Sequence, residues 1–103
     1  MPGVEVVSTF NNIPSEVLFS VFEARGQATP PSMVYCGDTQ TGKDLAATLI
    51  RDVGFDPIDA GWLQNARYTE PFAMLVAHLA YEGAEGPKLA YRFERFRQLG
   101  VVE

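Results

Sequence analysis

Cysteine and histidine are scarce in this sequence: each occurs once in 103 residues, as Cys36 and His78. One cysteine excludes a disulfide within the chain, and the pair supplies too few ligands for a zinc site, so we expect no metal centre. No apolar run approaches the ~20 residues that a membrane helix requires. Eight Lys and Arg stand against 13 Asp and Glu, giving a formal net charge of −5. This acidic balance disfavours binding to nucleic acid or to an anionic membrane.

Apolar residues make up 47% of the chain and charged residues 20%, a balance that supports a packed core rather than disorder. The length suits one domain, so we expect a single domain over 1–103. The first residues, Met-Pro-Gly-Val-Glu, have neither the basic region nor the apolar stretch of a signal peptide. We therefore expect a cytoplasmic protein.

Short runs rich in β-branched and other apolar residues predict three strands, at 4–10, 33–36 and 55–60. Helical spacing of apolar residues predicts two helices, at 13–23 and from about 39 to 53. The strand at 33–36, the helix from about 39 to 53 and the strand at 55–60 form a βαβ unit, whose two strands should be parallel.

Cap residues flank both predicted helices. Asn11 or Asn12 is a candidate N-cap of the first helix, and Thr39 or Thr41 of the second. Gly54 stands where a glycine commonly follows a helix.

The segment 61–81 predicts a long helix that is apolar on more than one face, which is typical of a helix covered by a partner. Pro71 should kink it, because proline removes the hydrogen bond to the Arg67 carbonyl. The segment 89–96 fits either an edge strand or a short helix. We therefore predict an α/β fold in the order βα-βαβ-α. Three main helices accompany a small, mostly parallel sheet of three or four strands, in a homodimer formed through the 61–81 helix.

The segment 37–44 matches the phosphate-binding loop G-x-x-x-x-G-K-[ST] except at its last position. Asp44 replaces the hydroxyl that would hold magnesium, and Asp38 adds a second negative charge near a polyphosphate. A capped turn from strand to helix is the favoured interpretation of this segment.

Four residues are candidates for acid–base catalysis: Asp59, Arg67, Glu70 and His78. Arg67 and Glu70 are three residues apart on a predicted helix and can pair, with Asp59 close by. This cluster fits a structural ion pair, and it also fits a polar rim that orients a ring-shaped ligand. His78 lies in an apolar run, which is more typical of a core or interface histidine than of a catalytic base. The apolar neighbours of Cys36 are typical of a buried, inert thiol.

Four motifs in order give the chain a family resemblance: VVSTFNNIP (6–14), VYCGD (34–38), GFDPIDAG (54–61) and LQNARYTEP (63–71). Together they resemble the C-terminal half of the coenzyme F-420 (deazaflavin)-dependent NADP oxidoreductases and related dinucleotide-binding reductases. The resemblance implies hydride transfer between NADPH and a deazaflavin or flavin. The residues that it places at the ring cofactor are Asn11, Asn12, Ile13, Pro14, Trp62 and Leu63.

The chain departs from that family in several ways, and one of them is Thr39, which breaks the acidic pair usual after Gly37. The glycine-rich turn G-x-G-x-x-G, which presents a helix N-terminus to the pyrophosphate, is absent. Trp62 also stands where the family has a small residue or proline. We therefore expect a truncated protein that binds NADPH only with a partner supplying the Rossmann half.

Three hypotheses remain open at the level of sequence. The chain is the ring-cofactor and dimerisation half of such a reductase and is not catalytic alone. Alternatively, it is a cofactor-free enzyme that uses the vacated cofactor pocket for another small molecule. The third alternative is an interaction module for a separate dinucleotide-binding subunit.

Overall fold

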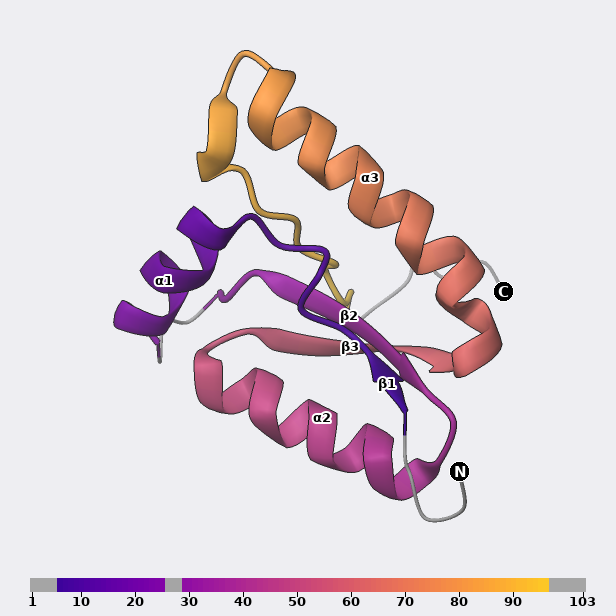
Figure 1. Cartoon of the computed structure of the whole chain (residues 1–103). Helices are drawn as coiled ribbons and strands as arrows, with labels where there is room; N and C mark the ends of the chain where they lie inside the picture. Colours follow the sequence, from indigo (N-terminus) through magenta and orange to yellow (C-terminus); the bar gives the residue numbers. More distant parts are fainter. Residues whose placement is uncertain (1–5, 26–28, 97–103) are drawn as a thin grey trace, which may run out of the picture.

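The computed structural model describes residues 6–25 and 29–96, which form three strands, three α-helices and two short 3-10 helices (Figure 1). In chain order they are β1 (Val7–Ser8), α1 (Ser15–Glu23), β2 (Ser32–Gly37), α2 (Gln40–Val53), β3 (Asp56–Trp62), η1 (Leu63–Asn65), α3 (Ala66–Glu82) and η2 (Gly86–Lys88). The predicted α/β class and the three main helices are confirmed. Residues 4 and 5 of the first predicted strand lie outside the described residues.

The sheet has the strand order β1-β2-β3 and is mixed. β2 and β3 are parallel, as the βαβ pattern predicts. β1 is antiparallel to β2, with Val7 opposite Gly37 and Ser8 opposite Cys36, so the sheet combines one parallel and one antiparallel pairing. The reason is the path of the chain. β1 runs toward the amino end of β2, and α1 then leads into that end, so the connection needs no crossover.

The core lies against β2, all of whose residues are buried. Two side chains of this strand, Met33 and Tyr35, form the centre of the core. The residues packed around them are Val17 and Val21 of α1, Ala46, Ala47 and Ile50 of α2, and Phe55. Figure 1 shows α2 and α3 on opposite sides of the sheet. Because β2 is both central and covered, its backbone polar groups need partners inside the protein.

Side chains, rather than a strand, supply those partners at Val34. Its carbonyl accepts hydrogen bonds from Thr9 Oγ1 at 3.1 Å and from Asn12 Nδ2 at 3.2 Å. Its N–H donates to the Tyr91 hydroxyl at 2.9 Å. Asn12 is therefore not the N-cap of α1. That position belongs to Pro14, and no side chain caps the helix.

The segment 89–96 is neither strand nor helix, but it is attached to β2 in an irregular conformation. The Ser32 N–H donates to the Tyr91 carbonyl at 2.8 Å, and the Phe93 N–H donates to Ser32 Oγ at 2.8 Å. The aromatic rings of Tyr91 and Phe93 pack with Phe72 of α3, with ring centroids 4.8 Å apart for Phe72 and Tyr91. This segment therefore joins α3 to the central strand.

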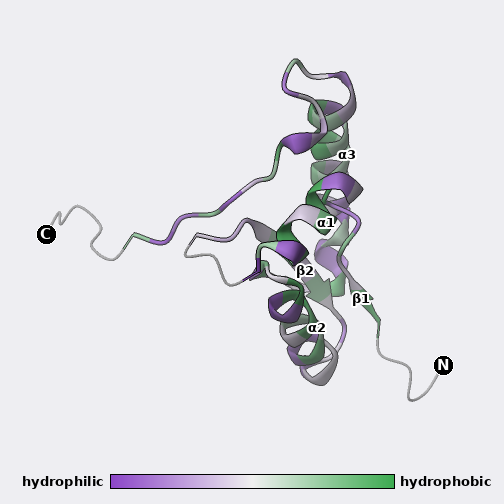
Figure 2. Ribbon diagram, turned by 90° about the vertical axis from the view of Figure 1, so that its left-hand side faces the viewer, coloured by the Kyte–Doolittle hydropathy of each residue, from purple (hydrophilic) through white to green (hydrophobic). Residues whose placement is uncertain are grey.

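α3 begins five residues later than the predicted 61–81 helix, because Gly61 still belongs to β3 and has a left-handed φ of 98°. Much of α3 is hydrophobic along its length (Figure 2). Only Thr69 and Ala80 are buried in it, whereas Met74 is 72% exposed and Leu75 54% exposed. The predicted excess of apolar surface on this helix is thus present and uncovered in the single chain.

α2 has the predicted caps at both ends. Thr39 Oγ1 accepts a hydrogen bond from the Gly42 N–H at 3.0 Å. Gly54 follows the helix with a φ of 117°, in the region that favours glycine. A Cβ atom added there would lie 2.9 Å from Arg25 Cβ and 3.0 Å from the Val21 carbonyl oxygen. This glycine therefore allows α1 and the end of α2 to approach closely.

We expect Gly54→Ala to lower the free energy of unfolding by more than about 2 kcal/mol, because backbone strain and overpacking add. Gly86→Ala is the matched control. Gly86 also has a positive φ, 72°, but a Cβ atom there meets nothing within 4 Å, so only the backbone term of roughly 1–2 kcal/mol applies. Urea unfolding of both variants measures the difference, and equal losses would contradict the close approach of α1.

Candidate functional site

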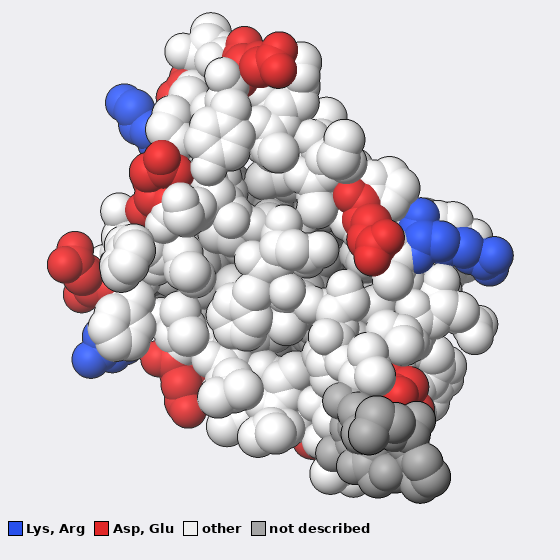
Figure 3. Space-filling model, viewed as in Figure 1, with Lys and Arg blue, Asp and Glu red and all other residues white. Residues whose placement is uncertain are grey.

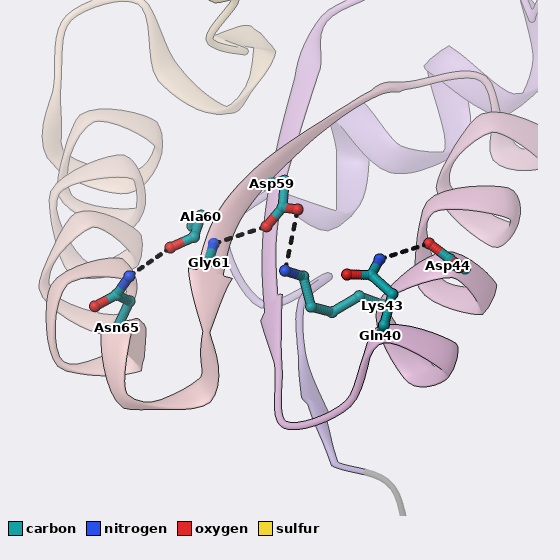
Figure 4. Close-up of polar contacts among 7 residues, drawn as sticks. All are labelled: Gln40, Lys43, Asp44, Asp59, Ala60, Gly61 and Asn65. Carbon is teal, nitrogen blue, oxygen red and sulfur yellow. Dashed lines mark hydrogen bonds and ion pairs between the residues drawn. The ribbon is translucent and has the colours of Figure 1, made fainter.

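Open sheets with parallel strands bind ligands at the carboxyl ends of those strands, which here are the ends of β2 and β3. An ion pair between a buried lysine and a half-exposed aspartate occupies this edge (Figure 4). Lys43 Nζ lies 3.1 Å from Asp59 Oδ2, and the Lys43 side chain is only 5% exposed. The same ammonium lies 4.1 Å from the ring centroid of Trp62. Gly37 leaves room for the lysine, since a Cβ atom there would lie 2.9 Å from Lys43 Cγ.

This arrangement excludes a phosphate-binding loop at 37–44. α2 already begins at Gln40, so Gly42 and Lys43 belong to its first turns and their N–H groups bond to Thr39. The Lys43 ammonium points to Asp59 instead of a ligand. Asp44 accepts a hydrogen bond from Gln40 Nε2 at 2.8 Å, which places its carboxylate at the same end of the helix. The segment is a capped turn, as the sequence favours.

Polar contacts also fix the turn from β3 into α3. Asp59 Oδ1 accepts a hydrogen bond from the Gly61 N–H at 2.7 Å, and Asn65 Nδ2 donates to the Ala60 carbonyl at 2.7 Å (Figure 4). Asp59 thus holds both Lys43 and the turn. These contacts give it a structural role rather than that of an available acid or base.

A groove of about 720 Å³ lies on α3 beside the connection between β1 and α1. The residues that line it are Asn11, Arg67, Glu70, Pro71, Ala73, Met74 and Ala77. A smaller hollow of about 200 Å³ adjoins it and shares Asn11, Ala73 and Ala77. The loop residues Asn11, Asn12, Ile13 and Pro14 all line this hollow. One side of α3 and one short loop therefore border two adjoining parts of an open depression.

Arg67 and Glu70 face the groove without pairing with each other in the described part of the chain. The Arg67 guanidinium lies 5.1 Å from the ring centroid of Tyr68, which belongs to the same helix. The expected cluster of Asp59, Arg67 and Glu70 is therefore divided, since Asp59 pairs with Lys43. What remains at the groove is one positive and one negative side chain at the start of α3.

The other candidate residues lie elsewhere. His78 is not a core histidine: its side chain is 63% exposed, and its Nδ1 lies 4.0 Å from a Glu82 carboxylate oxygen. Trp62 is half exposed and contacts Lys43 rather than the groove lining. The Leu63 carbonyl accepts a hydrogen bond from Cys36 Sγ at 4.0 Å.

Burial changes the acidity of two groups in β2. Cys36 is fully buried, and this desolvation raises the pKa of its thiol, as expected for an inert cysteine. Burial also raises the pKa of Tyr35, with the Asp59 carboxylate adding to the effect. Neither group has the lowered pKa of an activated nucleophile.

Within residues 6–25 and 29–96, no three His, Cys, Asp or Glu side chains gather as a metal site would require. In the same ranges, no helix is both long enough and apolar enough to cross a membrane. The sequence matches no known protein family, and no curated protein is significantly similar to it.

Sequence reasoning considered Lys43 only as a phosphate ligand and missed its pairing with Asp59. The parallel register, in which Tyr35 is opposite Asp59, is the feature that brings this aspartate to the start of α2. Sequence reasoning also missed Tyr91, whose partners Asn12 and Val34 are far from it along the chain. An isolated tyrosine in an alternating segment carries no local signal of such contacts.

We expect the two members of the ion pair to respond unequally to substitution. Asp59→Asn keeps the acceptor for Gly61 but leaves a buried ammonium without a carboxylate, so it should lower the free energy of unfolding by about 1–3 kcal/mol. Lys43→Met fills similar space without a charge and leaves a half-exposed carboxylate that water can reach, so its loss should stay below about 1 kcal/mol. Denaturant unfolding of both variants and of the double variant, which should resemble Lys43→Met, measures this. A larger loss in Lys43→Met would contradict it.

Proposed function

We propose that this chain is the ring-binding and dimer-forming part of an NADP/deazaflavin oxidoreductase-like protein and does not transfer hydride by itself. The observation that carries the proposal is the groove on α3. Of the six residues that the family resemblance places at a ring cofactor, four line the depression formed by the groove and its adjoining hollow. Trp62 and Leu63 are not among the residues that line it.

The groove has the size and lining that a flat tricyclic ring needs. Its volume falls within the roughly 300–1,000 Å³ of small-molecule sites. Ala73, Met74 and Ala77 offer a low apolar wall for the face of a ring. Asn11, Arg67 and Glu70 stand around that wall and offer hydrogen-bond donors and acceptors. This combination of an apolar face and a polar edge matches a flavin or a deazaflavin.

The polar residues have separate roles in this proposal. The Asn11 amide can donate to one ring atom and accept from another, Arg67 donates to ring carbonyl oxygens, and Glu70 accepts from a ring N–H. A bound deazaflavin or flavin would supply the hydride-accepting ring. The chain's own contribution is to hold the plane of that ring along α3.

A separate subunit would supply the binding site for NADPH. A pyrophosphate needs a helix N-terminus with little negative charge around it. The start of α2 instead has Asp38, Asp44 and Asp59 close by, and Lys43, the nearby cation, is paired. These carboxylates would repel a dinucleotide, which supports the requirement for a Rossmann partner.

Helix α3, which bears the groove, also supports a homodimer. Figure 3 shows charged side chains around the periphery of one face and a broad uncharged area between α1 and α3. On α3, Leu75 is 54% exposed and Leu79 is 42% exposed, and neither residue lines the groove or the adjoining hollow. Pairing of this surface with a second copy would remove apolar area from water. His78 would then be an interface histidine.

We expect the purified chain to bind FMN or a deazaflavin saturably in the absence of NADPH, as measured by fluorescence titration. The chain alone should oxidise no NADPH. Arg67→Met should weaken ring binding about tenfold, because one charge-assisted hydrogen bond is lost. Arg51→Met is the matched control, since Arg51 is exposed on α2 and lines neither part of the depression. Absence of binding to both rings, or equal effects of the two substitutions, would overturn the proposal.

We expect light scattering to give the mass of a dimer, and Leu75→Glu to convert it to a monomer, because the substitution introduces a charge into an apolar interface. Leu45→Glu is the matched control, since Leu45 is 59% exposed on α2, which lies on the other side of the sheet from α3. A monomeric native chain would refute dimerisation while leaving the ring-binding proposal in place.

A further inference from the structure

The half-buried Tyr91 hydroxyl is the centre of a hydrogen-bond network that the proposed function does not yet use. It accepts from the Val34 N–H at 2.9 Å and donates to Asn12 Oδ1 at 2.5 Å. Burial raises the pKa of Tyr91 to about 12, so the hydroxyl keeps its proton at neutral pH. Both functions of the hydroxyl are therefore engaged with the β1–α1 loop and the central strand.

Asn12 is fixed from both ends of its amide. It is 2% exposed, and its Nδ2 donates to the Val34 carbonyl at 3.2 Å, as well as to Asn11 Oδ1 at 3.4 Å. With Oδ1 held by Tyr91, the amide has one orientation in which every polar atom has a partner. Asn12 in turn anchors the loop to β2.

The loop needs such an anchor. Phe10, two residues before Asn12, has a φ of 65°, a left-handed conformation that bulky residues rarely adopt. Strained backbone of this kind persists only where the surrounding contacts hold it. Asn11 lies between Phe10 and the anchored Asn12 and lines both parts of the depression.

We propose that Tyr91 is a positioning residue of the ring site: its hydroxyl orients Asn12, which sets the loop conformation that presents Asn11 to the groove. This inference rests on the proposed function of the groove. Tyr91 does not line the groove, and it acts through Asn12. The segment 89–96 thereby controls ring affinity from outside the site.

The tyrosine ring itself has a packing role that must be separated from this one. It contacts the rings of Phe72 and Phe93, with ring centroids 4.8 Å and 5.7 Å away. Tyr91→Phe keeps the aromatic ring and removes only the hydroxyl. It leaves the Asn12 oxygen and the Val34 N–H without their partner.

The experiment is a titration of the full chain with FMN and with a deazaflavin. We expect Tyr91→Phe to weaken binding about tenfold, equivalent to about 1.4 kcal/mol. Tyr35→Phe is the matched control, because it removes the hydroxyl of a buried tyrosine that lies near Asp59, away from the groove, and it should leave affinity unchanged. In the Asn12→Ala background, Tyr91→Phe should have no further effect if it acts through Asn12. Equal affinities of Tyr91→Phe and native chain, or additive effects in the double variant, would overturn the inference.

Amide hydrogen exchange separates this inference from the proposed function. Tyr91→Phe should speed exchange at 11–13 and at Val34 by about tenfold, while amides in the middle of α2 keep their protection. If the native chain binds neither ring, the proposed function fails, and selective exchange at the loop still supports positioning by Tyr91. Unchanged exchange at the loop would overturn the inference, whatever the ring titration shows.

Discussion

The buried central strand imposes the requirement on which the rest of the structure depends. Every residue of β2 is buried, so each of its backbone N–H and C=O groups must find a partner away from water. β3 satisfies one edge along most of its length, but β1 is only two residues long. Thr9, Asn12 and Tyr91 complete the other edge with side chains and with one backbone carbonyl. The β1–α1 loop and the segment 89–96 therefore lie where they do because β2 needs them.

Local patterns in the sequence were sufficient for the parts of the fold that local forces determine. The caps at Thr39 and Gly54, the helix between them and the parallel pairing of β2 with β3 were predicted and are confirmed. The direction of β1 was not predictable in this way, because it depends on how the chain returns to β2 rather than on any residue in the strand. The pattern of the segment 89–96 fits both a strand and a helix for a related reason. Its bonds to β2 satisfy the strand without forming a regular ladder.

The candidate site shows the same division. Asn11 to Pro14 came from a resemblance, and the structure places these residues along the depression on α3. The sequence alone does not show that Asp59 lies apart from Arg67 and Glu70 in space, because all three are charged and close in sequence. The turn at Gly61 separates them: it leaves Asp59 with Lys43 at the end of the sheet and carries the other two onto α3. The exposure of His78 could not be predicted from the sequence either. Its apolar neighbours on α3 suggest burial, but they are themselves exposed.

The contact between Asn12 and Tyr91 joins residues 79 positions apart in the chain. Bringing such distant residues together requires closure of a long loop, whose entropy is lost before the contact contributes. In the proposed role of Tyr91, the loop at Asn11 reaches its final conformation when Tyr91 docks, whereas helices α1 and α2 and the β2–β3 pair can form from closer residues. The groove would then be completed late in folding. During synthesis, the amino-terminal part of the groove would wait for the segment 89–96 to leave the ribosome.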